Sequence, residues 1–289
     1  MLSAGIDAGV AYTKVVILKD GAVAGKGIGP TGGVDRRERI EEVYHEALRD
    51  AGLSAGEVEH IAVTGKGKFD AGFAHKRVSE QLAAGKAAGH VYPDTTCVVS
   101  AGADETMVSV IEEGGRIGEY AFNQKCTAGL GLFLEYMADR LGMSLAELGS
   151  LDIAMEGAGG AAGDAACEAV GDIACEAAGD APCEAAGRAA VNEGCVVFAE
   201  LDALSLLNHG VAPAEVGKAV VYAAAARVSS VINDITKPSA AHVTLLGGLA
   251  KNVAFVKALE ALTGLTFAIP ADAEYAGALG AALTAAGSA

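Results

Sequence analysis

Two cysteines have the residue type and the position to do chemistry. Cys126 lies in NQKCTAGLG, a glycine-broken turn just ahead of an apolar run, and Cys195 lies in NEGC ahead of a second apolar run that Gly210 closes. The start of a helix carries a partial positive charge and N–H groups without helical partners. A thiolate, or a larger anion held by a cysteine, is stabilised at such a place. Each cysteine is therefore a candidate metal ligand at a helix entrance.

The elements behind the cysteines are amphipathic helices. After Cys126, apolar residues recur at three- and four-residue steps, and Glu135, Asp139 and Arg140 fall on the opposite face. The apolar positions are Leu132, Phe133, Tyr136, Met137 and Leu141. This pattern predicts a helix from Gly131 onward, with free N–H groups at its start. The run after Cys195 predicts a helix over 196–208, followed by another over 214–234.

The N-terminal segment offers a candidate phosphate site. A short strand at 3–6 leads through a glycine turn to strands at 15–18 and 22–28, with Asp-Gly as the hairpin signal. Asp7 would face the metal of a nucleotide or its water, and Gly9 would let the turn approach phosphate oxygens, with Thr13 and Lys14 as nearby polar groups. Such a hairpin is more often only a hairpin. The chain has no GxxxxGK[ST] loop, which excludes a Walker-type site.

Three later strands also end in glycine-rich turns. A helix at 36–51 leads to a strand at 60–63 and then to TGKGK, which could line a cleft or be an exposed loop. After a helix at 78–88, a strand at 96–100 ends in AGADE, with Gly102, Asp104 and Glu105. A strand at 242–246 ends in GGLAKN before a helix at 253–262. There Gly247 and Gly248 present bare backbone to an adenosine or a phosphate, beside Lys251 and Asn252. This succession predicts an α/β fold.

Composition excludes several classes of protein. The 289 residues carry a formal charge of −16, from 21 basic and 37 acidic side chains, so binding to nucleic acid or to an anionic membrane is not expected. No apolar run approaches the roughly 20 residues of a membrane span, and the N-terminus lacks a signal-peptide layout. We therefore expect a cytoplasmic protein whose cysteines are thiols or metal ligands. Cys97, inside a strand, is expected to be a small buried hydrophobe.

An internal repeat interrupts the globular pattern between 152 and 194. GDAACEAV, GDIACEAA and GDAPCEAA follow one another with a period of eight from residue 163 to residue 186. On a helix this period would leave successive cysteines about 80° apart, and the glycines and Pro182 argue against one helix. The favoured interpretation is a mobile surface insertion at about 152–192; an extra metal site at Cys167, Cys175 and Cys183 is the alternative.

Deletion of residues 163–186 tests these two interpretations. A segment that builds no core can be removed without loss of folding, so the shortened protein should keep its secondary structure and any metal held elsewhere in the chain. Circular dichroism and metal analysis of the purified variant measure both quantities. Loss of metal in proportion to the thiols removed would instead identify the repeat as a metal site.

Five motifs in order resemble the ATPase family of 2-hydroxyacyl-CoA dehydratase activators and benzoyl-CoA reductase subunits. They are GIDAGVAYTK, NQKCTAGLGLFLE, CVVFAELD, LLGGLAKN and EYAGALGAAL, and they span nearly the whole chain except the repeat. The resemblance implies an actin-like α/β fold of two ribonuclease H-like lobes around a nucleotide cleft, here expected at 1–95 and 96–289. It also implies ATP and Mg²⁺ as ligands and coupling of ATP hydrolysis to low-potential electron transfer.

The same resemblance implies a dimer that holds one [4Fe–4S] cluster between its subunits. Its ligands would be Cys126 and Cys195 of each subunit, and two cysteines per chain do require a second chain to complete a Cys₄ set. The dimer could be a homodimer or a heterodimer with a homologous subunit. The partner would be an acyl-CoA dehydratase or reductase component, and nucleotide-driven lobe movement would change the angle of the cluster helices.

One motif departs from the family's sequence. Where the family usually has DxGGQD, this chain has SAGADE, so Ser100 stands in the place of an aspartate that helps position metal or water. Asp104 or Glu105 could compensate, and with Asp7 they form the expected catalytic set. Two rival functions remain open, a small-molecule kinase of the same superfamily and a scaffold subunit that keeps the cluster but hydrolyses ATP poorly.

Overall fold

The computed structural model describes residues 1–32, 35–112, 116–123, 129–153, 189–235 and 242–287. Its first sheet has the strand order β3-β2-β1-β4-β5, in which β1 pairs antiparallel with β2 and parallel with β4. The strands are β1 (Leu2–Ala8), β2 (Tyr12–Lys19), β3 (Ala22–Pro30), β4 (His60–Thr64) and β5 (Lys76–Arg77). Helix α1 (Arg36–Ala51) buries Ile40, Val43, Tyr44, Ala47 and Leu48 against one face of this sheet.

The second sheet repeats the topology of the first. Its order is β8-β7-β6-β9-β10, with an antiparallel three-strand meander followed by two parallel strands. The strands are β6 (Cys97–Ala101), β7 (Thr106–Glu112), β8 (Arg116–Phe122), β9 (Val243–Leu246) and β10 (Phe267–Ala268). Cys97 is buried in β6, and burial raises the pKa of its thiol to about 11, as expected of a small core residue.

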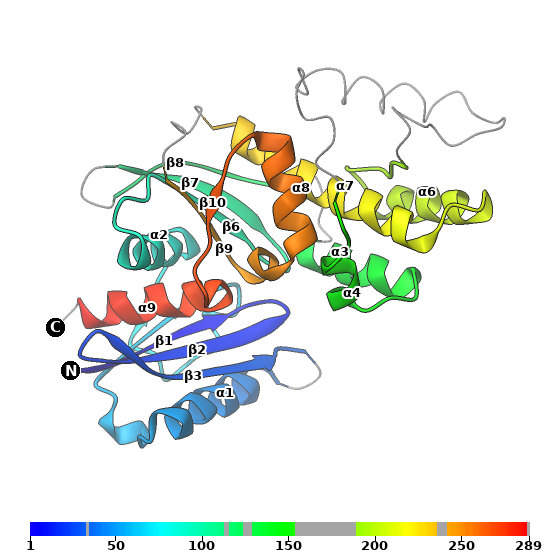
Figure 1. Ribbon diagram of the computed structural model, residues 1–289. Coiled ribbons are helices and arrows are strands. Elements are labelled where there is room, and N and C mark those ends of the chain that lie inside the picture. Colours follow the sequence, from blue (N-terminus) through cyan, green and yellow to red (C-terminus); the bar gives the residue numbers. More distant parts are fainter. Residues whose placement is uncertain (33–34, 113–115, 124–128, 154–188, 236–241, 288–289) are drawn as a thin grey trace.

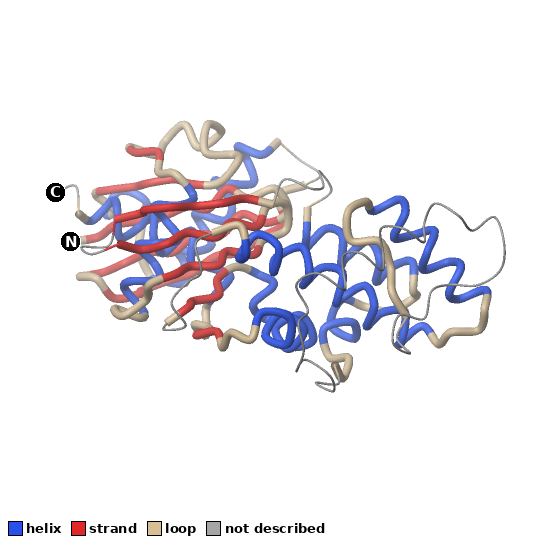
Figure 2. The backbone as a smooth tube through the Cα atoms, turned by 90° about the horizontal axis from the view of Figure 1, so that it is seen from above, coloured by secondary structure: helices blue, strands red, loops and turns tan. Residues whose placement is uncertain are grey.

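One large core lies on the outer face of the second sheet. It contains side chains of α3 (Leu130–Arg140), α6 (Val196–Asn208), α7 (Pro213–Asn233) and α8 (Val253–Thr263), with α4 (Leu145–Gly149) beside them. Viewed from above, the strands of both sheets occupy one side of the molecule and these helices extend to the other (Figure 2). Among the described residues, no helix combines the length and the hydropathy that crossing a membrane requires.

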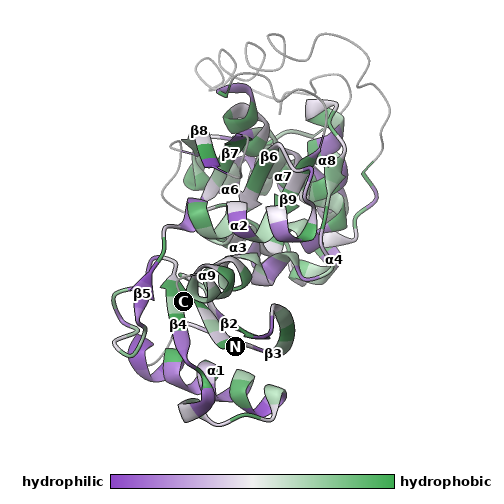
Figure 3. Ribbon diagram, turned by 90° about the vertical axis from the view of Figure 1, so that its left-hand side faces the viewer, coloured by the Kyte–Doolittle hydropathy of each residue, from purple (hydrophilic) through white to green (hydrophobic). Residues whose placement is uncertain are grey.

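Helices α2 (Glu80–Val91) and α9 (Ala276–Ala286) lie between the two sheets (Figure 1). Alanines of α2 pack on the second sheet, and α9 packs on β1, β2 and β4 of the first. Figure 3 shows the apolar helix α9 between the first sheet and the second. The helices cross at backbone contact, since a Cβ on Gly280 would lie 1.8 Å from the carbonyl oxygen of Ala83. The predicted boundary between two lobes at residue 95 stays a prediction. Helix α9 follows that boundary in the sequence but packs on strands of the first sheet.

Most predicted elements are present within a few residues, but one helix start differs, and some elements, among them α4, β5 and β10, were not predicted. Helix α2 was expected over 78–88 and begins at Glu80, because the hydroxyl of Ser79 accepts a hydrogen bond from the N–H of Leu82 and caps the helix there. Strands β7 and β8 were not predicted from the sequence. β8 is an edge strand with no fully buried residue, so it lacks the apolar alternation that marks a strand.

Candidate functional site

A cavity of about 360 Å³ opens between the two sheets, at the carboxyl ends of β1, β4, β6 and β9. Ligands of open α/β sheets bind at this end of the strands, where the connecting turns leave the sheet. Residues predicted from the sequence make up much of its wall: Asp7, Gly9, Lys14, Ser100, Gly102, Asp104, Glu105, Gly247, Gly248 and Lys251. The cavity is in the size range of small-molecule sites.

Asp7 lies near the end of β1 with glycines on both sides of its carboxylate. A Cβ on Gly277 would lie 3.0 Å from Asp7 Oδ2, and one on Gly65, whose φ is +89°, would lie 2.8 Å from Oδ1. Lys14, the cross-strand neighbour of Asp7, places its Nζ 3.4 Å from Oδ2. The carboxylate therefore faces the cavity beside a cation, with glycine backbone where side chains would otherwise crowd it.

Gly247 supplies the opposite wall. Its φ of +95° is a left-handed conformation that favours glycine, and a Cβ there would lie 2.2 Å from the carbonyl oxygen of Ala101. Its N–H donates to the carbonyl of Ala273, and Gly248 follows with open space around its Cα. The backbone of β9 thus reaches the cavity without a side chain, as the double glycine predicts.

A lysine and two glutamates meet across the cavity. Lys66, in the turn after β4, places Nζ 2.5 Å from Glu105 Oε2 and 3.6 Å from Glu80 Oε1. The hydrogen bond to Glu105 is the main cause that raises the pKa of Lys66. Burial raises the pKa of Glu80, with Lys66 opposing and Asp7 and Glu105 adding to the effect. The site therefore holds an acidic cluster around one lysine.

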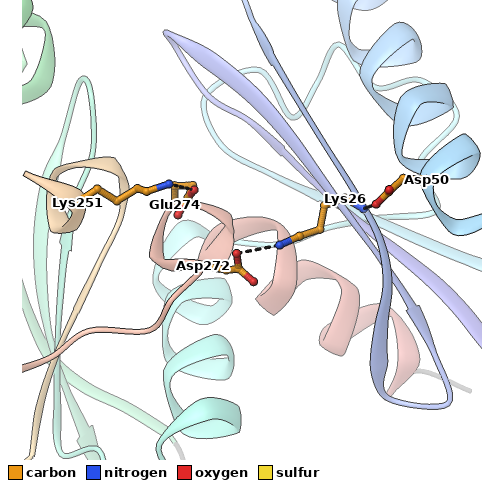
Figure 4. Close-up of polar contacts among 5 residues, drawn as sticks. All are labelled: Lys26, Asp50, Lys251, Asp272 and Glu274. Carbon is orange, nitrogen blue, oxygen red and sulfur yellow. Dashed lines mark hydrogen bonds and ion pairs between the residues drawn. The ribbon is translucent and has the colours of Figure 1, made fainter. Parts of the chain in front are cut away.

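The segment before α9 is anchored to both sheets. Lys26 of β3 places Nζ 2.8 Å from Asp272 Oδ1, and its backbone N–H donates to Asp50 of α1. On the other side, Lys251 forms an ion pair with Glu274 (Figure 4). Both pairs are partly exposed, so each contributes little alone, but they connect this turn to the first sheet and to the loop after β9.

Two predicted residues lie outside the cavity. Thr13 is fully buried, with its hydroxyl 3.2 Å from that of Thr31. Asn252 caps α8, because its side-chain oxygen accepts a hydrogen bond from the N–H of Phe255. Both have structural partners that single-sequence patterns do not reveal.

The cavity also contains acidic residues that the sequence did not single out. They are Glu80, Glu135 and Glu274. The cavity also contains Lys66, from the TGKGK turn, which the sequence left open as either a cleft wall or an exposed loop. The one signal for Glu80 was its place directly after a capping serine. Its presence in the cavity results from the position of α2 in the fold.

The start of α3 differs from its expected state. Helix α3 begins after Gly129, and the N–H groups of Gly131 and Leu132 donate to the carbonyls of Gly102 and Ala103. The expectation of free N–H groups at this helix start is wrong at these two positions. Glycines permit the approach, since a Cβ on Gly131 would lie 2.8 Å from the Cα of Ala103. The turn after β6 therefore touches the helix that follows Cys126. Cys126 itself lies outside the described residues.

Cys195 is the N-cap of α6 and is partly exposed. The side-chain oxygen of Asn192 accepts hydrogen bonds from the N–H groups of Gly194 and Cys195, and the carbonyl of Cys195 accepts the first helical hydrogen bond, from Ala199. The thiol thus stands at a helix entrance on an ordered turn, as the sequence predicts.

Helices α3 and α6 are joined by polar contacts. Glu200 of α6 accepts a hydrogen bond from the Tyr136 hydroxyl at 2.6 Å and lies 3.0 Å from Arg140 Nε. The buried Arg227 of α7 adds a further link, because it donates to the carbonyl of Glu193, just before α6, and lies over the ring of Phe133 in α3, 4.3 Å from its centroid. The helices that follow the two cysteines therefore form one unit.

Helix α6 presents an apolar row to solvent. Val197, Phe198, Leu201 and Leu204 recur at helical spacing and are 63%, 58%, 55% and 46% exposed. Contiguous exposed apolar side chains of this size are typical of interaction surfaces. The row begins two residues after Cys195.

These features define an α/β protein whose two sheets share one topology, with a cavity between them. Residues 4–285 match the BadF/BadG/BcrA/BcrD ATPase family, and the chain belongs to that family. It is 26% identical over 286 residues to the 2-hydroxyisocaproyl-CoA dehydratase activator of Clostridioides difficile, covering 98% of this chain and 94% of that protein. It is also 26% identical to one of the benzoyl-CoA reductase subunits of Thauera aromatica, covering 98% of this chain and 92% of that protein.

The fold agrees with a solved structure from the same family. Component A of (R)-2-hydroxyglutaryl-CoA dehydratase from Acidaminococcus fermentans superposes with a TM-score of 0.82 at 27% identity, covering 100% of this chain and 98% of that one. The family resemblance and the actin-like α/β fold expected from the sequence are thereby confirmed.

Proposed function

We propose that this chain is an ATP-dependent activator or subunit that passes electrons at low potential to a 2-hydroxyacyl-CoA dehydratase or a benzoyl-CoA reductase type enzyme. The relatives named above are activators and a reductase subunit. The observation that carries the proposal is the contact between the turn after β6, in the nucleotide cavity, and the first turn of α3, which follows Cys126.

The cavity fits MgATP. Bare backbone at Gly247 and Gly248 suits an adenosine or a phosphate, and Asp7 supplies the oxygen ligands that Mg²⁺ prefers. Lys14, beside Asp7, would balance the charge of a phosphate. Each group reaches the cavity from the end of a strand, so the site is held by the two sheets.

The cysteine helices fit a [4Fe–4S] cluster shared between two chains, which when bound would supply the electron. Among the described residues no three His, Cys, Asp or Glu side chains gather as a metal site, so Cys195 would need ligands from Cys126 and from a second copy. The apolar row of α6 gives that copy a surface beside Cys195, whether it is the same chain or a homologous one. The positive end of α6 would offset the cluster's negative charge.

The hydrogen bonds at the start of α3 would couple the nucleotide cavity to the helices that follow the two cysteines. A nucleotide that displaces the turn at 102–104 would displace the N–H groups of Gly131 and Leu132 with it, because these groups donate to its carbonyls. Helix α6 would follow through Glu200 and its contacts with Tyr136 and Arg140. Hydrolysis and exchange of the nucleotide would thus change the angle between the cysteine helices.

Three measurements on anaerobically purified protein test the proposal. Titration calorimetry should show binding of MgADP, and iron and sulfide analysis should give one four-iron cluster per dimer that air bleaches. The mass of the particle should be that of a dimer. A protein that binds no nucleotide, or that stays colourless after anaerobic reconstitution, would contradict the proposal.

Ser100→Asp tests the effect of the missing carboxylate. Ser100 lines the cavity one residue before the end of β6, where an aspartate would add a charge able to organise metal or water. The substitution should raise ATP turnover by about a hundred- to ten-thousandfold, the usual range for a positioned acid or base, and change nucleotide affinity little. Phosphate release and MgADP titration measure the two effects. Brisk hydrolysis by the wild type, with Ser100→Asp neutral or harmful, would show that Asp104 or Glu105 has taken over the role and that the missing carboxylate does not limit turnover.

A further inference from the structure

Glu80 is a half-buried carboxylate in the nucleotide cavity. It is the first residue of α2, directly after the capping Ser79, and it lines the cavity together with Asp7, Lys66 and Glu105. These residues come from the first sheet, the second sheet and the helix between them. Glu80 therefore stands where residues of both sheets meet in the cavity.

The crossing of α2 and α9 sets the position of Glu80. Gly280 of α9 lies against the backbone of Ala83, three residues after Glu80, and Gly277, one turn earlier in α9, lies against the carboxylate of Asp7. A Cβ on Gly280 would lie 1.8 Å from the carbonyl oxygen of Ala83, which excludes a side chain there, and one on Gly277 would make a tight contact of 3.0 Å with Asp7 Oδ2. The same helix thus contacts Asp7 and the start of α2, so the placement of Glu80 relative to Asp7 rests on helix packing and does not depend on a loop.

Three other acids of the cavity have closer ion-pair partners than Glu80. Glu105 lies 2.5 Å from Lys66, Asp7 lies 3.4 Å from Lys14, and Glu274 is paired with Lys251. The ion pair of Glu80 with Lys66 spans 3.6 Å, which is beyond hydrogen-bonding distance. Glu80 thus accepts no hydrogen bond from this lysine and keeps its acceptor capacity for a water molecule.

Its environment suits a proton acceptor. Burial raises the pKa of the Glu80 carboxyl, and the nearby charges of Asp7 and Glu105 add to the effect. A carboxylate with a raised pKa holds a proton more strongly, which improves general-base catalysis near neutral pH. Ser100, in the place where the family resemblance led us to expect an aspartate, offers no such group.

We propose that Glu80 is a catalytic residue that orients the attacking water and accepts its proton. The step rests on the proposed function, in which the cavity binds MgATP. The oxygen of the water bonds to the γ-phosphorus, and the bond from that phosphorus to the β–γ bridging oxygen breaks, leaving its electron pair on ADP. The proton of the water passes to the Glu80 carboxylate and then to solvent, so the products are ADP and phosphate.

Single-turnover hydrolysis with protein in excess over radiolabelled ATP tests this role, because it resolves slow rates. Glu80→Gln keeps the shape of the side chain but cannot accept the proton, and its rate constant should fall at least about a hundredfold. The dissociation constant of MgADP, measured by calorimetry, should stay nearly unchanged. Glu80→Asp keeps a carboxylate on a shorter side chain and should restore part of the rate.

Glu38→Gln is the matched control. Glu38 is an exposed acid in the first turn of α1 and does not line the cavity, so this variant loses a charge near a helix start without touching the ligand. Its rate should equal that of the wild type. Circular dichroism of Glu80→Gln should match the wild-type spectrum, since the Ser79 cap remains.

The outcomes separate two failures. Unchanged hydrolysis in Glu80→Gln with intact MgADP binding overturns the role of Glu80 and leaves the nucleotide site standing. A wild type that binds MgATP but releases no phosphate above the uncatalysed rate overturns that role as well. Absence of MgADP binding in the wild type overturns the proposed nucleotide site, and the role of Glu80 with it.

Discussion

Cys195→Ala should abolish the iron–sulfur cluster. The thiol lies at the entrance of α6 on a turn held by Asn192, and alanine leaves this backbone intact while removing a ligand that each subunit must supply. Cys126→Ala, outside the described residues, should have the same effect. Iron and sulfide analysis with visible absorption of anaerobically reconstituted protein measures the result.

Cys97→Ala serves as the control for cysteine removal. Cys97 is 1% exposed inside β6, so its thiol does not reach the surface where a second chain could share a cluster, and the variant should keep the cluster. Nucleotide binding should persist in all three variants, because the cavity lies between the sheets. Full iron content in Cys195→Ala would refute the assignment of the ligands.

Gly5→Ala should have the largest effect on stability. Gly5 lies in β1 under α9, and a Cβ there would lie 2.0 Å from the carbonyl oxygen of Ala278 and 2.2 Å from the nitrogen of Ala282. Backbone cannot give way as a side chain can, so we expect a loss in the free energy of unfolding of at least about 3 kcal/mol, the upper part of the usual range for overpacking. Urea unfolding followed by circular dichroism measures it.

Gly89→Ala is the control for Gly5→Ala, because the same substitution there should raise the free energy of unfolding instead of lowering it. Gly89 is exposed near the end of α2 with nothing within 4 Å of an added Cβ. Alanine in a helix is favoured over glycine by about 0.5–1 kcal/mol, so this variant should be slightly more stable. Equal effects of the two substitutions would contradict the close packing of α9 on β1.

The sequence predicted the strand ends of the cavity because their signals are local. Asp7, Gly102 and Gly247 each follow an apolar run that stops at a glycine turn, and the parallel strands bring these turns together. The helix after Cys195 was equally clear, since its apolar residues and its closing glycine lie in one stretch of chain.

The other features of the site could not be predicted from the sequence, because they depend on contacts between segments that are far apart in the chain. The place of Glu80 follows from the crossing of α2 and α9, two helices from opposite ends of the chain. The hydrogen bonds from the start of α3 to Gly102 and Ala103 likewise depend on how that helix meets the second sheet. Thr13 and Asn252 were expected to bind the ligand from their place in the sequence alone, which does not show that their side chains have Thr31 and the N–H of Phe255 as hydrogen-bond partners.

The position of α9 also bears on how the protein matures on the ribosome. One apolar face of the first sheet, whose four longer strands lie within residues 2–64, is covered by α9, and Ser3 donates a hydrogen bond to Ala282. Domains commonly fold one by one from the N-terminus during synthesis. Here one face of the first sheet stays uncovered until residues 276–286 have been synthesised, so this sheet cannot complete its core from the segment that forms its own strands.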